Sequence, residues 1–345
     1  MDVTTFVIVS VIKSVIAIIV LLTAVAYSVW LERKVVGHMQ NRWGPTRVGP
    51  FGLLQPLADG IKFLLKEDLT PPYVYKPLYI AAPMIAVIFA LTSISVIPIG
   101  NWIYIGDLHI PLQITDVNIG LLIILGITSM GVYGVALAGW SSNSKYSLLG
   151  GLRASAQMVS YEISLGLSLI GVLIMSGSFS LRTIVESQQG HFWGFIPKWN
   201  IFHGQEIAFF VYLMSAYAET NRVPFDLPEA ETELVAGYHT EYSAMKFAMF
   251  FMAEYANMIT VACLATLLFL GGWNGPLFGP YWLQAVLPVL WFVAKVFCFI
   301  FLYIWVRGTL PRFRYDQLMN FAWKFLFPLA IANLIITGLI VALRS

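Results

Sequence analysis

The chain has 345 residues, of which 59% are hydrophobic and only 11% are charged. A soluble domain normally carries about 25% charged residues. This composition therefore excludes an ordinary water-soluble enzyme and indicates a protein whose side chains lie mostly in lipid or against other helices. The formal net charge of +2 gives no sign of a nucleic-acid partner.

Eight apolar runs approach the roughly 20 residues that a helix needs to cross a hydrocarbon core. Because backbone groups in lipid must pair within their own segment, helices are the expected structure. The sequence predicts an all-α, polytopic transmembrane bundle that forms a single membrane domain over residues 1–345. The expected spans are Val3–Trp30, Leu78–Ile97, Asn118–Gly139, Gln157–Ser176, Phe202–Ala218, Phe247–Trp273, Trp282–Val306 and Phe321–Leu343.

The charges are distributed unevenly between the two sides of these spans. Loops 31–77, 140–156, 219–246 and 307–320 fall on one side, which carries fifteen Lys and Arg when Lys324 at the edge of the last span is included. The opposite side carries three. Because positive residues concentrate in cytoplasmic loops, we expect these four loops to face the cytoplasm and both termini to face outward.

The first of these loops contains a second kind of helix. Within Phe51–Lys66, apolar residues recur at helical spacing while polar residues occupy the opposite face. A helix of this length and charge is typical of an amphipathic segment that lies on the membrane surface. It is either a simple anchor or a lip along which an amphiphile enters from the bilayer, and the pattern alone leaves both possibilities open.

The loop 219–246 is dense in carboxylates and stiffened by prolines. Asp226, Glu229, Glu231 and Glu233 lie within eight residues of one another, and Glu219 precedes them at the membrane edge. Neighbouring carboxylates repel one another, which raises their proton affinity where solvent is limited. A solvated acidic patch remains the alternative to a proton-handling role.

Several ionisable residues fall inside the expected spans, where a charge is costly and commonly marks an ion or proton path. Glu162, Glu254 and Lys295 are the three for which we expect such a function. Together with Glu219 and the acids of the following loop, they predict a relay of carboxylates from the cytoplasmic side into the helices.

The sequence lacks the usual ligands of redox groups. The two cysteines have no metal-like spacing, no histidine lies mid-span where it could ligate a haem, and no glycine-rich phosphate loop or HExxH motif is present. We therefore expect no metal, haem or flavin in this chain. Any electrons must come from a partner.

Long motifs in these loops resemble the H subunit of the proton-pumping NADH:quinone oxidoreductase, respiratory complex I, which corresponds to the mitochondrially encoded subunit 1. The resemblance extends over nearly the whole chain. It rests on Glu32-Arg33-Lys34, on Gly44-Pro45 and Gly49 to Asp59, on Trp140 to Tyr146, on Ala218 to Glu233, on Gly237 to Tyr242 and on Arg307 to Asp316.

The resemblance implies a membrane subunit, in a bacterial plasma membrane, that docks the peripheral arm and forms most of a quinone tunnel. The implied tunnel residues are Arg33, Asp59, Arg222, Phe225, Asp226 and Phe251. The implied acidic funnel for proton coupling is Glu32, Glu162, Glu219, Glu229, Glu231, Glu233 and Glu254. Quinone is then the substrate. The implied partners are peripheral subunits that carry the terminal iron–sulfur cluster and the quinone headgroup site, small membrane-arm subunits, and lipid.

Two other functions compete with this one. A membrane anchor of a related hydrogenase-type complex would share the architecture without using quinone. A stand-alone ion carrier or channel would also contain buried charges, although the long inner loops suit a docking surface better than an uncoupled pore.

Overall fold

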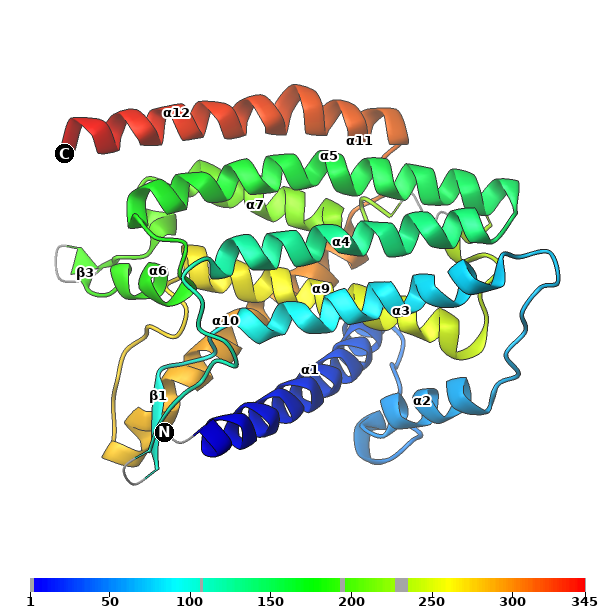
Figure 1. Cartoon of the computed structure of the whole chain (residues 1–345), viewed down its shortest axis with the longest axis horizontal. Helices are drawn as coiled ribbons and strands as arrows, with labels where there is room; N and C mark the ends of the chain where they lie inside the picture. Colours follow the sequence, from blue (N-terminus) through cyan, green and yellow to red (C-terminus); the bar gives the residue numbers. More distant parts are fainter. Residues whose placement is uncertain (1–2, 106–107, 193–195, 227–234, 345) are drawn as a thin grey trace.

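The computed structural model describes residues 3–105, 108–192, 196–226 and 235–344. Its long helices run side by side, with α1 and α10 slanting across the others (Figure 1). Both ends of the chain lie at the same end of this bundle, beside β1 and β3. The prediction of an all-α polytopic membrane bundle is confirmed, and the few strands belong to two small hairpins at that end.

Seven helical segments in the described residues are long and apolar enough to cross a membrane. The fifth expected span corresponds to α7, which has only 14 residues. It lies beside α5 in the bundle (Figure 1) but is too short to be one of the seven. The segments, together with α7, are α1 (Val3–Met39), α3 (Lys76–Thr92) with the 3-10 turn η2 (Ser93–Val96), α4 (Gly120–Ser141), α5 (Lys145–Ser176), α7 (Glu206–Glu219), α9 (Ala244–Phe269), α10 (Tyr281–Thr309), and α11 (Tyr315–Phe321) continued by the π-helical turn η5 (Ala322–Leu326) and α12 (Phe327–Arg344).

The helices extend beyond the apolar runs, which corrects the expected loop boundaries. The α1 helix continues to Met39, so the loop expected from residue 31 begins with two further helical turns. The α5 helix begins at Lys145, which reduces the expected loop 140–156 to a tight turn. Polar residues end the segment that lipid can cover but do not end a helix, because the hydrogen bonds of a helix join backbone groups and do not depend on side-chain polarity.

The centre of the bundle is α9. In its most apolar 18-residue stretch 61% of the residues are buried, compared with 6% for α1 at the edge. Helices α3, α10, α1 and α7 contact it, and α3, α4, α5 and α7 pack one against the next in sequence. The α4–α5 contact depends on glycine: a Cβ atom added to Gly139 would lie 2.7 Å from the carbonyl oxygen of Ser147. Small residues allow membrane helices to approach this closely.

The amphipathic segment forms the 3-10 turn η1 (Pro50–Gly52) followed by α2 (Gln55–Leu65), as expected for a surface helix. It contacts α1 and α9 and lies apart from the main layer of helices (Figure 1). Its apolar side chains Leu57, Leu64 and Leu65 are strongly exposed, which suits contact with lipid or an amphiphile.

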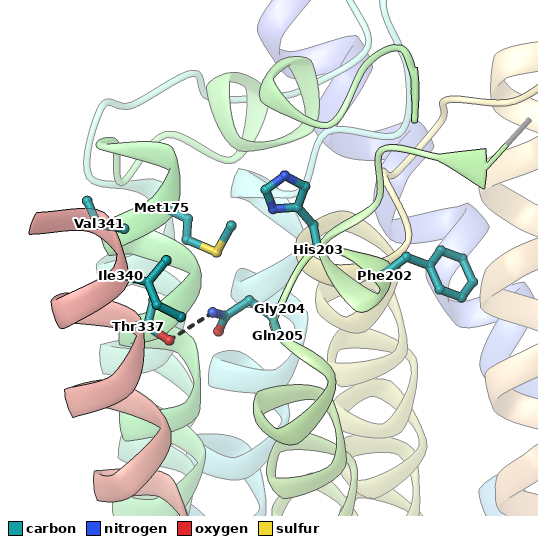
Figure 2. A pocket seen from close by; sticks show the side chains of 8 residues that line it. All are labelled: Met175, Phe202, His203, Gly204, Gln205, Thr337, Ile340 and Val341. Carbon is teal, nitrogen blue, oxygen red and sulfur yellow. Dashed lines mark hydrogen bonds between the residues drawn. The ribbon is translucent and has the colours of Figure 1, made fainter. Parts of the chain in front are cut away.

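The end that carries the termini holds the hairpin β1–β2 (Trp102–Ile105 and Leu108–Pro111), the short helix α6 (Leu181–Ser187), the hairpin β3–β4 (His191–Phe192 and Ile196–Pro197) and the 3-10 turn η3 (Asn200–Phe202). Figure 2 shows a pocket of about 290 Å³ here, between α5, the start of α7 and α12. Gln205 donates from Nε2 to Oγ1 of Thr337 at 3.0 Å across it. This buried polar contact fixes α12 to α7.

Candidate functional site

The guanidinium of Arg222, just after α7, lies between carboxylates from two other elements. Its Nη1 donates to Oε2 of Glu32 in α1 at 3.0 Å, and its Nε lies 2.6 Å from Oε1 of Glu254 in α9. The Tyr255 hydroxyl donates to the same Glu32 oxygen at 2.9 Å, and its ring lies 4.0 Å from the Arg222 Cζ atom. All of these side chains are nearly buried. The arrangement joins three elements that are distant in sequence.

Two further arginines complete this ionic cluster. Arg307 at the end of α10 donates to the second oxygen of Glu32. Arg312 donates from Nη2 to Oδ2 of Asp226 at 3.0 Å, and Asp226 interacts electrostatically with Glu254. The ionic cluster is hereafter the six residues Glu32, Asp226, Glu254, Arg222, Arg307 and Arg312. With three acids and three arginines it is formally neutral, which permits its buried members to remain charged, while Arg307 and Arg312 reach the cluster from exposed positions.

The surroundings of Arg222 and Asp226, the two cluster members in the loop after α7, determine their ionisation. Burial opposes the charged form of Arg222, but Glu254, Tyr255 and Glu32 outweigh it, so its pKa lies above its ordinary value and the group stays charged. Burial raises the pKa of the Asp226 carboxyl, although Arg312 and Arg307 oppose the shift. Of these two groups, Asp226 is therefore the one whose protonation can change.

A buried glutamine of α5 holds the loop that carries these residues. Gln157 donates from Nε2 towards the Ala218 carbonyl at 2.9 Å, the Phe225 carbonyl at 2.8 Å and the Asn221 side chain at 3.1 Å. The Phe225 ring packs between Tyr161 and Phe313, with ring centroids 5.6 and 5.5 Å apart. These contacts fix residues 218–226 against α5.

A second group of carboxylates lies on α7 and α5. Glu219 at the end of α7 interacts electrostatically with Glu162 of α5, whose carboxyl contacts the Ser129 hydroxyl. The rings of Tyr217 and Tyr303 stack with centroids 3.8 Å apart. Tyr303 interacts electrostatically with both Glu219 and Arg222. The tyrosine pair therefore connects the two groups of acids.

The remaining expected tunnel residues border the ionic cluster. Arg33 in α1 forms an ion pair with Asp59 in α2 at 2.6 Å, and Gln55 donates to the same carboxylate. This pair ties the surface helix to the end of α1. Phe251 in α9, one turn from Glu254, packs against Phe247 and His239. The tunnel residues therefore lie at the loop end of α1, α2 and α9.

Lys295 does not join the carboxylates. Its Nζ donates to three backbone carbonyls that follow α9, those of Leu270, Gly272 and Asn274, at 2.7 to 2.9 Å. The ammonium also lies 4.4 Å from the Trp199 ring. This lysine satisfies the end of α9, on the side of the bundle that carries the termini. Glu229, Glu231 and Glu233 lie outside the described residues.

Several members of the site were missed by reasoning from the sequence. Arg307 and Arg312 stood in a quoted motif, but the pattern did not reveal which carboxylates they pair with. A glutamine inside an apolar run, Gln157, was a signal that could have been used, since buried amides need partners. The stacked Tyr217 and Tyr303 come from different helices and gave no local signal.

Comparisons with known proteins agree over most of the chain. The family model described as NADH dehydrogenase matches residues 12–338. The chain is 72% identical to the H subunit 2 of NADH-quinone oxidoreductase from Koribacter versatilis (strain Ellin345), with 98% of each chain covered. It is 52% identical to the H subunit 1 from Solibacter usitatus (strain Ellin6076), also over 98% of each, and 54% identical to the H subunit from Protochlamydia amoebophila (strain UWE25) over 92% of each.

No group of three or more His, Cys, Asp or Glu side chains in the described ranges could hold a metal ion. Buried carboxylates beside arginines, on a scaffold of membrane helices, are the chemistry that this part of the chain offers. Given the full-length similarity, the chain belongs to the H-subunit family of NADH-quinone oxidoreductase, as a multi-pass membrane subunit of respiratory complex I.

Proposed function

We propose that this subunit forms the quinone-access chamber at the junction with the peripheral arm, and that its buried carboxylates couple quinone reduction to proton translocation. The observation that carries the proposal is the ionic cluster, which begins beside Arg33 at the membrane edge and continues through the tyrosine pair to Glu219 and Glu162. Charged groups buried among membrane helices cost free energy, and a loop that served only as an anchor would not need them.

The chamber would be entered along α2. The exposed leucines of this helix present an apolar surface, while the Arg33–Asp59 pair holds its polar face to α1. An isoprenoid tail could slide past the leucines as its headgroup moves towards Arg222 and Asp226. Phe225 and Phe251 supply aromatic surface at the chamber wall. Peripheral subunits with the terminal iron–sulfur cluster would supply the electrons and the contacts that hold the headgroup.

The coupling step is electrostatic. Quinone takes up two electrons and two protons on reduction to quinol, and the electrons arrive before the charge is neutralised. Negative charge beside the ionic cluster favours protonation of its acids, and Asp226 and Glu254 are positioned to respond because each already shares its arginine partners. A change at Glu254 then alters the field at Glu219 and Glu162. Glu229, Glu231 and Glu233 would extend the same set towards the cytoplasm.

The proposal is tested by Glu254→Gln, Glu219→Gln and Glu162→Gln in the assembled complex. We expect each to lower NADH–quinone turnover coupled to proton uptake by about tenfold or more, because an amide cannot change its charge. Glu206→Gln, at the opposite end of α7 and exposed, is the matched control and should retain full activity.

Activity with NADH and an artificial acceptor that accepts electrons before quinone separates assembly from coupling. It should remain in all four variants. Wild-type pumping and quinone turnover in all three core variants would rule out the coupling role. Membership of a quinone oxidoreductase subunit family argues against the hydrogenase anchor and the independent ion carrier.

The orientation belongs to the same proposal. The fifteen-to-three distribution of Lys and Arg places the loop end in the cytoplasm and both termini outside a bacterial plasma membrane. Reporter fusions that are active only in the cytoplasm should be inactive when attached after Ser345. Activity of such a fusion would reverse the assignment.

A further inference from the structure

A second cavity of the described residues runs along α1 from Val9 to Leu31, so that its inner end adjoins Glu32 of the ionic cluster. It is a groove of about 760 Å³ between α1, α10 and the segment that follows η2. Its walls are almost entirely apolar and include Ile16, Val20, Ile97, Phe292, Val296 and Ile300. This groove, hereafter the α1 groove, takes no part in the function proposed above.

One cation stands in the α1 groove, and its hydrogen-bonding capacity is mostly unused. Among the described residues, the Lys13 Nζ atom has a single acceptor, the Gln113 carbonyl at 3.3 Å, and it forms no ion pair. An ammonium has three donors. Lys295 of the same protein, also inside a span, places its ammonium on three carbonyls. The fold therefore gives the ammonium of Lys295 a full set of hydrogen-bond acceptors, and it gives the ammonium of Lys13 only one among the described residues.

The depth of Lys13 corresponds to a lipid headgroup. The polar edge of α1 on the loop side begins at Arg33. A hydrocarbon core about 30 Å thick is crossed by about 20 helical residues, or slightly more for a tilted helix. Counting back from Arg33 places the opposite boundary close to Lys13. The apolar run of α1 begins at Val3, so the Lys13 ammonium reaches the phosphates along its four methylene groups, and the apolar part of the groove extends from it into the hydrocarbon region.

We propose that the α1 groove is a binding site for an anionic phospholipid of the outer leaflet. The phosphate would accept hydrogen bonds from the Lys13 ammonium, and an acyl chain would lie along α1 against Phe292 and Val296. A quinone tail would fill the apolar part equally well but offers no anion to the lysine. Charge complementarity at this depth therefore favours the phospholipid.

The test uses the purified, delipidated complex and phosphatidylglycerol with a photoreactive group in one acyl chain. After irradiation, mass spectrometry locates labelled peptides of this subunit. We expect labelling on residues 9–31 of α1 and residues 292–300 of α10, competed by unlabelled phosphatidylglycerol about tenfold better than by phosphatidylcholine. Unlabelled ubiquinone should compete poorly.

Two variants separate the charge from the groove. Lys13→Gln should abolish the preference for phosphatidylglycerol, whereas Lys13→Arg should keep it. Ala17→Phe, which fills the apolar wall without changing charge, should reduce labelling by both lipids. Lys324→Gln is the matched control, an exposed lysine at the other membrane edge, and should behave as wild type.

The proposal fails if these peptides are not labelled, if ubiquinone displaces the label better than phosphatidylglycerol, or if Lys13→Gln keeps the headgroup preference. A neighbouring subunit that covers the groove in the complex would give the first of these results. Quinone reduction by the Lys13 variants is a separate readout, so failure of this proposal leaves the chamber proposal standing.

Discussion

The guanidinium of Arg222 lies between Glu32 and Glu254, two carboxylates separated by more than 200 positions in the chain. Nearly buried charges remain charged only where partners compensate them. Removing this arginine leaves two carboxylates facing each other without their shared cation. The neutral balance of the ionic cluster therefore makes Arg222 a determinant of both structure and coupling.

Arg222→Gln should destabilise the subunit by about 3 kcal/mol or more, the usual cost of breaking a buried ion pair. The expected result is less assembled complex on blue-native gels and a lower unfolding temperature. Arg222→Lys keeps the positive charge but cannot reach both carboxylates. Its amount of assembled complex and its unfolding temperature should lie between those of wild type and Arg222→Gln. Arg47→Gln, an exposed arginine of the first inner loop, should match wild type. An unaffected Arg222→Gln complex would mean that the cluster is not structurally important.

The stability of the folded subunit should depend on pH through His239. Burial among Tyr238, Phe247 and Phe251 lowers its pKa from 6.5 to about 4. Between pH 6.5 and 4 the unfolded chain therefore binds more protons than the folded chain. The contribution of neutral His239 to the free energy of unfolding is complete above pH 6.5 and is lost as the pH falls towards 4. The total amounts to about 3 kcal/mol.

The unfolding temperature of the complex should fall over this pH window, and His239→Phe should flatten the decrease. His191→Phe, at an exposed position, should leave it unchanged. An identical pH dependence in wild type and His239→Phe would show that this histidine is not the group responsible.

At the scale of elements, the loop 218–226 depends on the helix beside it. Gln157 of α5 supplies one amide to three acceptors of that loop. Gln157→Leu is similar in volume but donates nothing, and unpaired buried acceptors cost about 1–3 kcal/mol each. We expect faster hydrogen exchange in peptides that cover Thr220 to Asp226, together with lower quinone reductase activity.

Gln189→Leu, an exposed glutamine at the other end of the bundle, is the control for this exchange measurement. It should leave peptides around Asp226 as protected as in wild type. Equal protection in Gln157→Leu would show that the loop is held by other contacts, such as the packing of Phe225 between Tyr161 and Phe313.

Elements were the part of the structure most open to prediction. Apolar runs of membrane length gave the helices and the surface position of α2, because both follow from local pattern. Helix ends were placed less well: α1 and α5 continue through polar residues that favour water without breaking a helix. The short α7 was placed as a span from its own apolar run, Phe202–Ala218, although the helix itself has only 14 residues.

The site was predicted in its residue types and only partly in its grouping. Carboxylates inside spans stand out because burial is costly there, and Glu32, Glu219 and Glu254 were found in this way or through family motifs. Lys295 met the same criterion, yet it contacts backbone carbonyls at the opposite end. Which charge meets which is decided by helix packing between distant segments, and no single-sequence pattern contains that information.

At the scale of the whole molecule, the acids follow the path from the loop end of α1 to the interior of α5. Electrostatic interactions link Arg222 of the ionic cluster to Tyr303, Tyr303 to Glu219, and Glu219 to Glu162. The α1 groove is lined by apolar side chains of α1 and α10. The subunit therefore separates a polar interior, proposed for coupling, from an apolar exterior that meets lipid.

The most direct test of coupling is the infrared difference spectrum of the assembled complex on quinone reduction. The account predicts carboxyl C=O bands that change with reduction, weaken in Glu254→Gln and Glu219→Gln, and remain unchanged in Glu206→Gln. A spectrum without carboxyl bands, or with bands that are identical in all of these variants, would contradict it.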